Sequence, residues 1–132
     1  MTFRPEAIQG HGQQRAGGVI DYRLARMGVV AEFRKGRLAQ HEVCDAHPEL
    51  KRAAASASEP TEMECPICEE DQIVLVTYAF GDRLPASGRC ITKKGEVANL
   101  AKGRRRLAVY VVEVCPSCSW NHLAKSFALG TA

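Results

Sequence analysis

The sequence has no long hydrophobic run. The two longest apolar stretches among its 132 residues, 73–80 and 107–112, are far shorter than the about 20 residues of a membrane-spanning helix and have the length of strands. The N-terminus also lacks a positively charged segment followed by an apolar one, which is the pattern of an export signal. We therefore expect a cytoplasmic protein that does not bind a membrane.

Common catalytic motifs are absent as well. The sequence contains no glycine-rich phosphate loop, no Gly-x-Ser-x-Gly elbow and no His-Glu-x-x-His. The net charge of +3 is too small to indicate nucleic-acid binding by itself, and the content of 45% apolar and 25% charged residues is that of an ordinary globular protein. We expect a folded protein that is not an enzyme.

Six cysteines are many for a chain that we expect in a reducing compartment, where cysteines bind metals or act as redox groups more often than they form disulfides. Four of them form two matching Cys-Pro-x-Cys pairs, Cys65 with Cys68 and Cys115 with Cys118. Proline favours the tight turn in which both sulfurs of a pair face one point. Two such turns supply four thiolates, a closed tetrahedral shell for one structural zinc ion.

Two details depart from the common zinc pattern. Glu69 and Ser119 follow the second cysteine of each pair, where glycine is usual, and 46 residues separate the pairs instead of about 15–20. A long hairpin or an inserted loop must fill this gap. Two other interpretations therefore stay open: redox-active dithiols and disulfide cross-links.

Periodicity and turn residues divide the chain into parts. We predict helices over 19–35, 38–46 and 48–55, a short helix over 96–102, and strands over 72–80, 106–114 and 119–129. Gly36 should end the first helix, and His47 or Asp45 should cap the helix that starts at Pro48. The predicted parts are a flexible N-terminus (1–18), a helical segment (19–55), a linker (56–64) and a zinc-ribbon-like domain (65–130) with a basic insertion (83–106).

These elements predict an α+β fold. An N-terminal helical segment would precede a C-terminal, three-stranded, antiparallel sheet of the zinc-ribbon type. Such a sheet is too small to bury much apolar surface, so the metal would contribute most of its stability.

Positive charge is concentrated in one stretch. Residues 89–106 hold seven basic side chains and the single acid Glu96, and this imbalance suggests a contact surface for nucleic acid or an acidic partner. The stretch has no aromatic residue on which bases could stack, and a solvated loop is the alternative. The candidate contacts are Arg89, Lys93, Lys94, Lys102, Arg104, Arg105 and Arg106.

A smaller group recurs at three-residue intervals: His41, Cys44 and His47. On a helix the first two would share a face, so they could form a second metal site with an outside ligand, although a structural role without metal is the alternative. Trp120 is expected to cover the zinc thiolates, and His122 is expected to donate a hydrogen bond rather than bind metal.

Several strings resemble a known family. They occupy residues 43–50, 76–84 and 110–115, and the most specific is Cys-Ser-Trp-Asn-His-Leu at 118–123. From residue 22 to residue 130 the chain resembles an uncharacterised family of small, zinc-ribbon-like actinobacterial proteins, a domain of unknown function. The resemblance implies a bacterial cytoplasmic protein without an assigned activity.

The functional hypothesis is a non-catalytic, zinc-binding accessory module of a transcription or translation machine. Its partner would be RNA polymerase, the ribosome or nucleic acid, by analogy with other small zinc-stabilised folds. One alternative is a protein-interaction adaptor that acts through the N-terminal helices, with Tyr22 and Phe33 as contacts. The other is a thiol and zinc redox sensor. The sequence leaves the oligomeric state open.

Overall fold

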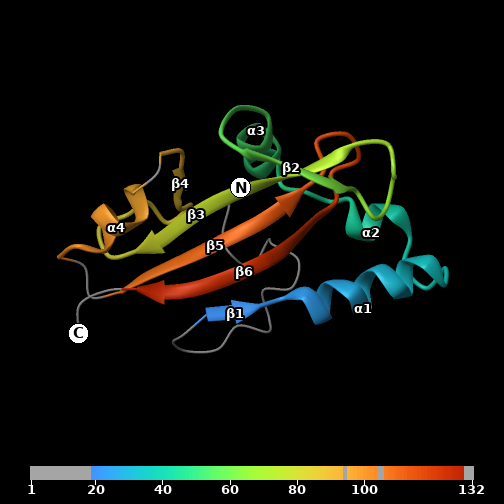
Figure 1. Ribbon diagram of the computed structural model, residues 1–132, viewed down its shortest axis with the longest axis horizontal. Coiled ribbons are helices and arrows are strands. Elements are labelled where there is room, and N and C mark those ends of the chain that lie inside the picture. Colours follow the sequence, from blue (N-terminus) through green and yellow to red (C-terminus); the bar gives the residue numbers. More distant parts are fainter. Residues whose placement is uncertain (1–18, 94, 104–105, 130–132) are drawn as a thin grey trace.

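The computed structural model describes residues 19–93, 95–103 and 106–129, and its centre is a curled antiparallel sheet of six strands (Figure 1). The strand order is β1-β6-β5-β3-β2, and β4 also pairs with β3. The strands are β1 (Val19–Asp21), β2 (Glu59–Glu64), β3 (Gln72–Gly81), β4 (Arg89–Ile91), β5 (Leu107–Val114) and β6 (Asn121–Leu129). The two long central strands β3 and β5 are rich in valine and tyrosine, which favour extended backbone.

Within the described residues, four helices accompany the sheet: α1 (Arg23–Arg34), α2 (Gln40–Val43), α3 (Pro48–Ser56) and α4 (Glu96–Ala101). Gly36 ends α1 as predicted, because its positive φ of 77° lets the N–H groups of Gly36 and Arg37 bond back to Phe33 and Glu32. His47 caps α3 as predicted, since its Nδ1 accepts the N–H of Glu49 at 3.1 Å. No helix in the described part of the chain has the length and apolar character that crossing a bilayer requires.

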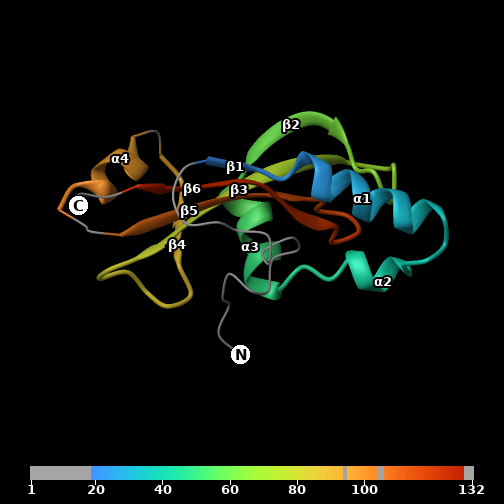
Figure 2. The same ribbon diagram turned by 90° about the horizontal axis from the view of Figure 1, so that it is seen from below.

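The helices lie on both sides of the sheet. Leu50 and Ala53 of α3 pack on one face, against alternate side chains of the central strands such as Val76 and Val112. Complete burial of Leu50 contributes about 2 kcal/mol to folding. The short helix α4 packs on the opposite face near Val109. Figure 2 shows α3 and α4 on opposite sides of the strands.

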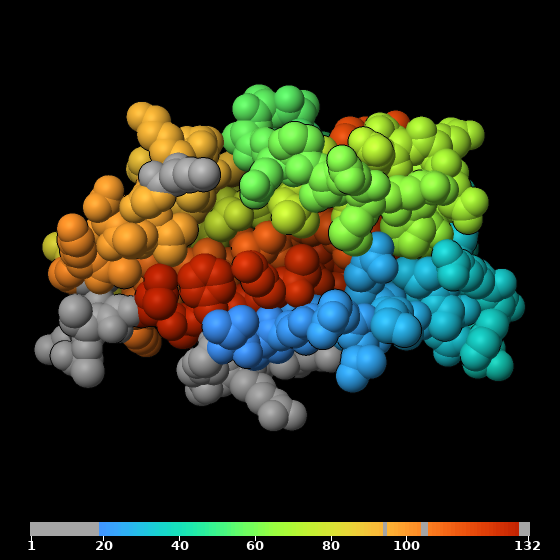
Figure 3. Space-filling model, viewed as in Figure 1, coloured from blue at the N-terminus to red at the C-terminus, as the bar shows by residue number. Residues whose placement is uncertain are grey.

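The face that carries α4 is only partly covered. Between α4 and the segment after α3, an open groove of about 670 Å³ exposes parts of β3, β5 and β6 (Figure 3). Leu75, Val111 and Phe127 supply apolar surface in this groove, and Lys93 and Lys125 supply positive charge.

The predicted fold class is wrong. The three strands predicted from the sequence are present, but they are the middle of a six-stranded sheet, not a three-stranded sheet of the zinc-ribbon type. β1 lies in the segment predicted as helix and pairs with β6, β2 lies in the predicted linker and pairs with β3, and β4 lies in the basic insertion. The helices pack on this same sheet instead of forming a helical segment of their own.

The missed strands are short or polar. β1 and β4 have three residues each, and β2 reads Glu-Pro-Thr-Glu-Met-Glu, so neither hydrophobic alternation nor apolar content marks them as strands. They are strands because β3 and β6 each present a free edge whose backbone N–H and C=O groups require partners. Sheet pairing therefore overrides local propensity at these positions.

Candidate metal centre

The two Cys-Pro-x-Cys turns meet at one end of the sheet. The first turn connects β2 to β3, and the second connects β5 to β6. Because β3 and β5 are antiparallel neighbours, with Val74 opposite Val114, the start of β3 lies beside the end of β5. The 46-residue gap between the turns is therefore spanned by a single excursion along β3 and back along β5.

The two turns share two backbone features. Glu69 and Ser119, each directly after the second cysteine, have left-handed φ values of 56° and 74°. Their N–H groups bond to the carbonyl oxygens of Cys65 and Cys115 at 3.2 and 3.0 Å. The conformation that usually calls for glycine thus forms without it, at a strain of about 1 kcal/mol per residue.

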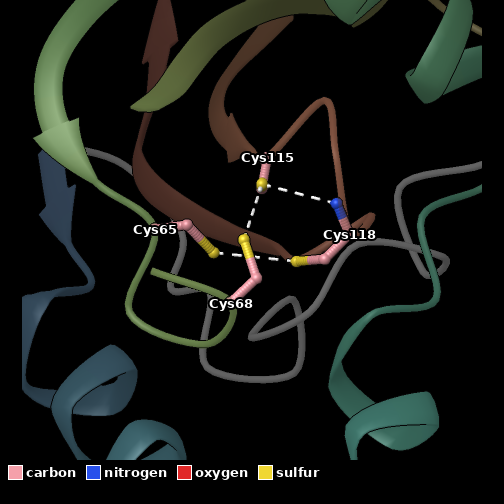
Figure 4. Close-up of side chains that lie close together, drawn as sticks. All are labelled: Cys65, Cys68, Cys115 and Cys118. Carbon is pink, nitrogen blue, oxygen red and sulfur yellow. Dashed lines mark hydrogen bonds between the residues drawn. The ribbon is translucent and has the colours of Figure 1, made fainter. Parts of the chain in front are cut away.

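Figure 4 shows the four sulfurs directed toward one another from the two turns. All four sulfur atoms lie within 4.8 Å of one another. The Sγ atoms of Cys68 and Cys115 are 3.6 Å apart, and those of Cys65 and Cys118 are 3.7 Å apart. Sulfurs bound at about 2.3 Å to a tetrahedral zinc are about 3.8 Å from one another, so the cluster has the dimensions of a four-thiolate metal site.

Burial raises the pKa of two of these thiols. It raises the pKa of Cys115 to about 11 and also raises the pKa of Cys118. Although burial also disfavours the thiolate of Cys68, hydrogen bonds from the N–H of Glu70 and from the neighbouring thiols lower the pKa of Cys68. Without a cation, four thiolates at this spacing would repel one another; a divalent ion compensates that charge.

A hydrogen bond joins the two turns outside the sulfur cluster. The Ser117 hydroxyl of the second turn donates to the Asp71 carboxylate, which follows the first turn, at 2.7 Å. This bond is the main cause that lowers the pKa of Asp71. The turns are therefore held together by side chains as well as by the sheet.

An apolar cluster surrounds the sulfurs. Trp120 is fully buried and packs with Cys65 and Cys115, together with Val30 from α1 and Val43 from α2. His122 stacks on Trp120 at a centroid distance of 5.9 Å, and its Nδ1–H donates to the carbonyl of Leu123 at 2.7 Å, as expected of a donor. The cluster shields one side of the site from water.

Sequence reasoning missed a buried ionic network beside this cluster. Glu113 accepts the Trp120 indole N–H at 3.3 Å and pairs with the Arg26 guanidinium of α1. The Glu113 side chain is only 3% exposed. The sequence does contain an indication of this network, because Glu113 is the single charged residue in the otherwise apolar β5.

In the described part of the chain, the three residues of the suggested second metal site have separate surroundings. His41 is exposed in α2, and His47 serves as the cap of α3. Cys44 instead lies beside the four-cysteine cluster, with its sulfur 3.4 Å from that of Cys118. The sequence separation of 74 residues hid this proximity.

Among the described residues, two of the predicted basic contacts are paired with acids. Arg89 pairs with Glu96 at 2.6 Å, and Arg106 pairs with Asp82 at 3.6 Å. Lys93 and Lys102 are exposed. The other predicted contacts, Lys94, Arg104 and Arg105, lie outside the described residues.

Comparison with known proteins agrees with the resemblance noted in the sequence. Uncharacterized protein Rv0049 of Mycobacterium tuberculosis and uncharacterized protein Mb0050 of Mycobacterium bovis are each 45% identical to the chain over 113 residues. The alignment covers 86% of this chain and 82% of each relative. No solved structure matches the chain. Residues 12–132 match the model of a family of unknown function, DUF5318, and the chain therefore belongs to that family.

Proposed function

We propose that the protein is a non-catalytic module that binds one structural zinc ion through Cys65, Cys68, Cys115 and Cys118. The observation that supports it most is the sulfur geometry, in which the distances of 3.6 and 3.7 Å approach the edge of a zinc–thiolate tetrahedron.

The donor set favours zinc. Four soft thiolates in a tetrahedral arrangement suit zinc or iron and disfavour calcium and magnesium, which bind oxygen ligands. Four protein ligands also leave the metal no open position for water or substrate. This closed shell is the reason to propose a structural role instead of a catalytic one.

The proposed zinc would stabilise one end of the sheet. It would join the β2–β3 turn to the β5–β6 turn, and the apolar cluster around Trp120 would pack against its ligands. Helices α1 and α2 contribute Val30 and Val43 to that cluster, so loss of the metal should also loosen their packing.

Metal analysis of the purified protein tests this proposal. We expect one zinc per chain by inductively coupled plasma mass spectrometry, and less than half of that content in a Cys115→Ser variant. Cys90→Ser is the matched control, because Cys90 is a half-buried cysteine whose nearest hydrogen-bond acceptor is the carbonyl of Ala57, far along the sheet from the cluster. A full zinc content in Cys115→Ser, or a coloured iron protein with charge-transfer absorption, would contradict the proposal.

For the partner, we propose a nucleic-acid-containing machine of transcription or translation, such as RNA polymerase or the ribosome. The exposed Lys93 and Lys102 support a contact with phosphates, whereas Arg89 and Arg106 are already paired with acids. The test is a pull-down from the bacterium's own lysate, with and without nuclease, at two salt concentrations. Recovery that falls steeply with salt and is lost in a Lys93→Glu, Lys102→Glu variant is expected. If recovery of the partner does not depend on salt but is lost in Leu24→Asp, α1 would instead be the contact surface of an adaptor, because Leu24 is 83% exposed on that helix.

A further inference from the structure

A fifth sulfur contacts one corner of the metal centre. The Sγ of Cys44 lies 3.4 Å from the Sγ of Cys118, which is closer than either of the contacts of 3.6 and 3.7 Å between ligand sulfurs. Cys44 does not belong to the group of four sulfurs that lie within 4.8 Å of one another. It therefore touches a ligand without being one of the four, and in the proposed four-cysteine site its thiol stays unligated.

The backbone around Cys44 holds this contact in place. The N–H of Ala46 donates to the carbonyl of Ser119 at 3.2 Å, and the Asn121 amide donates to the Asp45 carboxylate at 3.0 Å. Three consecutive residues after α2 thus contact the second cysteine turn or the residue that starts β6. The Cys44–Cys118 contact is part of a small interface instead of a chance approach of one side chain.

Solvent reaches Cys44 and Cys118 more easily than the ligands Cys65 and Cys115. Cys65 and Cys115 are 0% and 1% exposed, whereas Cys44 and Cys118 are both half-buried. Cys68 is also half-buried, but its nearest sulfur neighbour is the ligand Cys115, whereas Cys118 has a neighbour that is free of the metal. A small oxidant in water can meet the Cys118 thiolate with a second, unligated thiol beside it.

We propose that Cys44 and Cys118 are a redox modification site, in which a hydroperoxide converts the pair into a disulfide and releases the zinc. This inference rests on the zinc site proposed above. The Cys118 thiolate attacks the terminal oxygen of the hydroperoxide, the O–O bond breaks, and Cys118 becomes a sulfenic acid while the other oxygen leaves as hydroxide or alkoxide. The Cys44 thiol sulfur then attacks the Cys118 sulfur, the S–O bond breaks, and the hydroxide leaves as water with the thiol proton. The two sulfurs together lose two electrons, and the peroxide is reduced.

The geometry requires little rearrangement for this step. The two sulfurs must approach from 3.4 Å to the about 2.05 Å of a disulfide bond, which rotation about the side-chain torsions of two half-buried residues can supply. The new bond removes Cys118 from the shell, and three thiolates hold zinc less tightly than four. A dithiol reductant reverses the change, and the four ligands can bind zinc again.

The test uses the full, zinc-loaded protein and hydrogen peroxide. Zinc release is followed with a chromogenic chelator, and the disulfide is located by alkylation of the free thiols, digestion without reduction and mass spectrometry. We expect a Cys44–Cys118 cross-link that forms together with zinc release, and rebinding of zinc after treatment with dithiothreitol. The Cys44→Ser variant should release zinc about tenfold more slowly, because the remaining sulfur neighbour of its Cys118 sulfenic acid is the buried Cys65, which the proposed zinc holds as a ligand.

Controls separate this inference from the zinc proposal. Cys90→Ser should release zinc at the wild-type rate, and Cys44→Ser should contain one zinc per chain before oxidation. Release from Cys44→Ser at the wild-type rate, or a cross-link between Cys68 and Cys115 in its place, would overturn the inference and leave the zinc site standing. A zinc-free Cys44→Ser variant would also overturn it, since Cys44 would then be a ligand. A wild-type protein without any zinc would refute the zinc proposal itself.

Discussion

The guanidinium of Arg26 on α1 forms an ion pair with the carboxylate of Glu113, one residue before the end of β5. Their side chains are 21% and 3% exposed. The pair lies where α1 crosses the end of the sheet, next to the buried Trp120. It connects a surface helix to the strand that leads into the second cysteine turn, so it couples the packing of α1 to the metal centre.

Removal of Arg26 should destabilise the protein. Arg26→Ala leaves the Glu113 carboxylate buried without its cation, and we expect the free energy of unfolding to fall by about 3 kcal/mol. Urea denaturation in the presence of zinc measures this. Arg23→Ala is the matched control, because the Arg23–Asp21 pair is exposed on both sides and should contribute little. Equal losses in the two variants would contradict the role of the buried pair.

A glycine after the first cysteine turn should stabilise the protein. Glu69 is exposed and has a φ of 56°, so Glu69→Gly relieves left-handed strain without loss of a packed side chain. Glycine also raises the conformational entropy of the unfolded chain, which offsets part of the relieved strain. We therefore expect a net gain of about 0.5 kcal/mol in the free energy of unfolding. Glu70→Gly, at the neighbouring acid whose φ is not positive, should have the opposite effect. A loss in both variants would show that the left-handed turn carries no strain.

Zinc affinity should rise with pH. The pKa of Cys115 is raised to about 11 and that of Cys118 is raised as well, so both thiols hold their protons at neutral pH when no metal is bound. Zinc must displace these protons, and each proton released should increase the affinity about tenfold per pH unit. Competition with a chromophoric chelator between about pH 6 and about pH 8 measures the slope. An affinity that does not change over this range would mean that the thiols are already ionised in the metal-free protein.

A buried hydroxyl pair fixes the start of α1 to the sheet. The Tyr22 and Ser126 hydroxyls are 3.0 Å apart, and Tyr22 is 1% exposed. Tyr22→Phe should lower the free energy of unfolding by about 1.5 kcal/mol because Ser126 loses its partner, and Ser126→Ala combined with Tyr22→Phe should recover part of this loss. A double-mutant cycle by thermal or urea unfolding measures the coupling. Strictly additive effects would show that the two hydroxyls do not interact.

The burial of Tyr22 also argues against its use as a contact in the adaptor hypothesis. Tyr22 was expected to be a contact for a protein partner, but it is buried in the same hydrophobic core as Leu50 of α3 and Leu123 of β6. A change at Tyr22 would therefore weaken association through unfolding and would not identify a partner surface. The exposed Leu24 and Met27 of α1 are the positions at which an adaptor surface can be probed without damage to the core.

Short-range signals in the sequence were sufficient for part of the fold. The Cys-Pro-x-Cys turns, the glycine that ends α1 and the proline that begins α3 are each specified by one or two neighbouring residues. The two central strands carry long runs of β-branched and aromatic residues, so their positions were predicted within one residue of the observed ends. For the candidate metal site, the repeated Cys-Pro-x-Cys spacing was sufficient to predict the four cysteines that the structure brings together.

Long-range pairing decided what these signals could not. The polar β2 and the three-residue β1 and β4 are strands only because β3 and β6 offer them free edges. Cys44 meets Cys118, and Arg26 meets Glu113, across 74 and 87 residues of sequence. Local composition determines which turns and strands a segment can form, whereas the antiparallel pairing of β3 with β5 determines which of them come together. That pairing satisfies the backbone hydrogen bonds of the two strands and aligns their apolar faces, and no single segment encodes it.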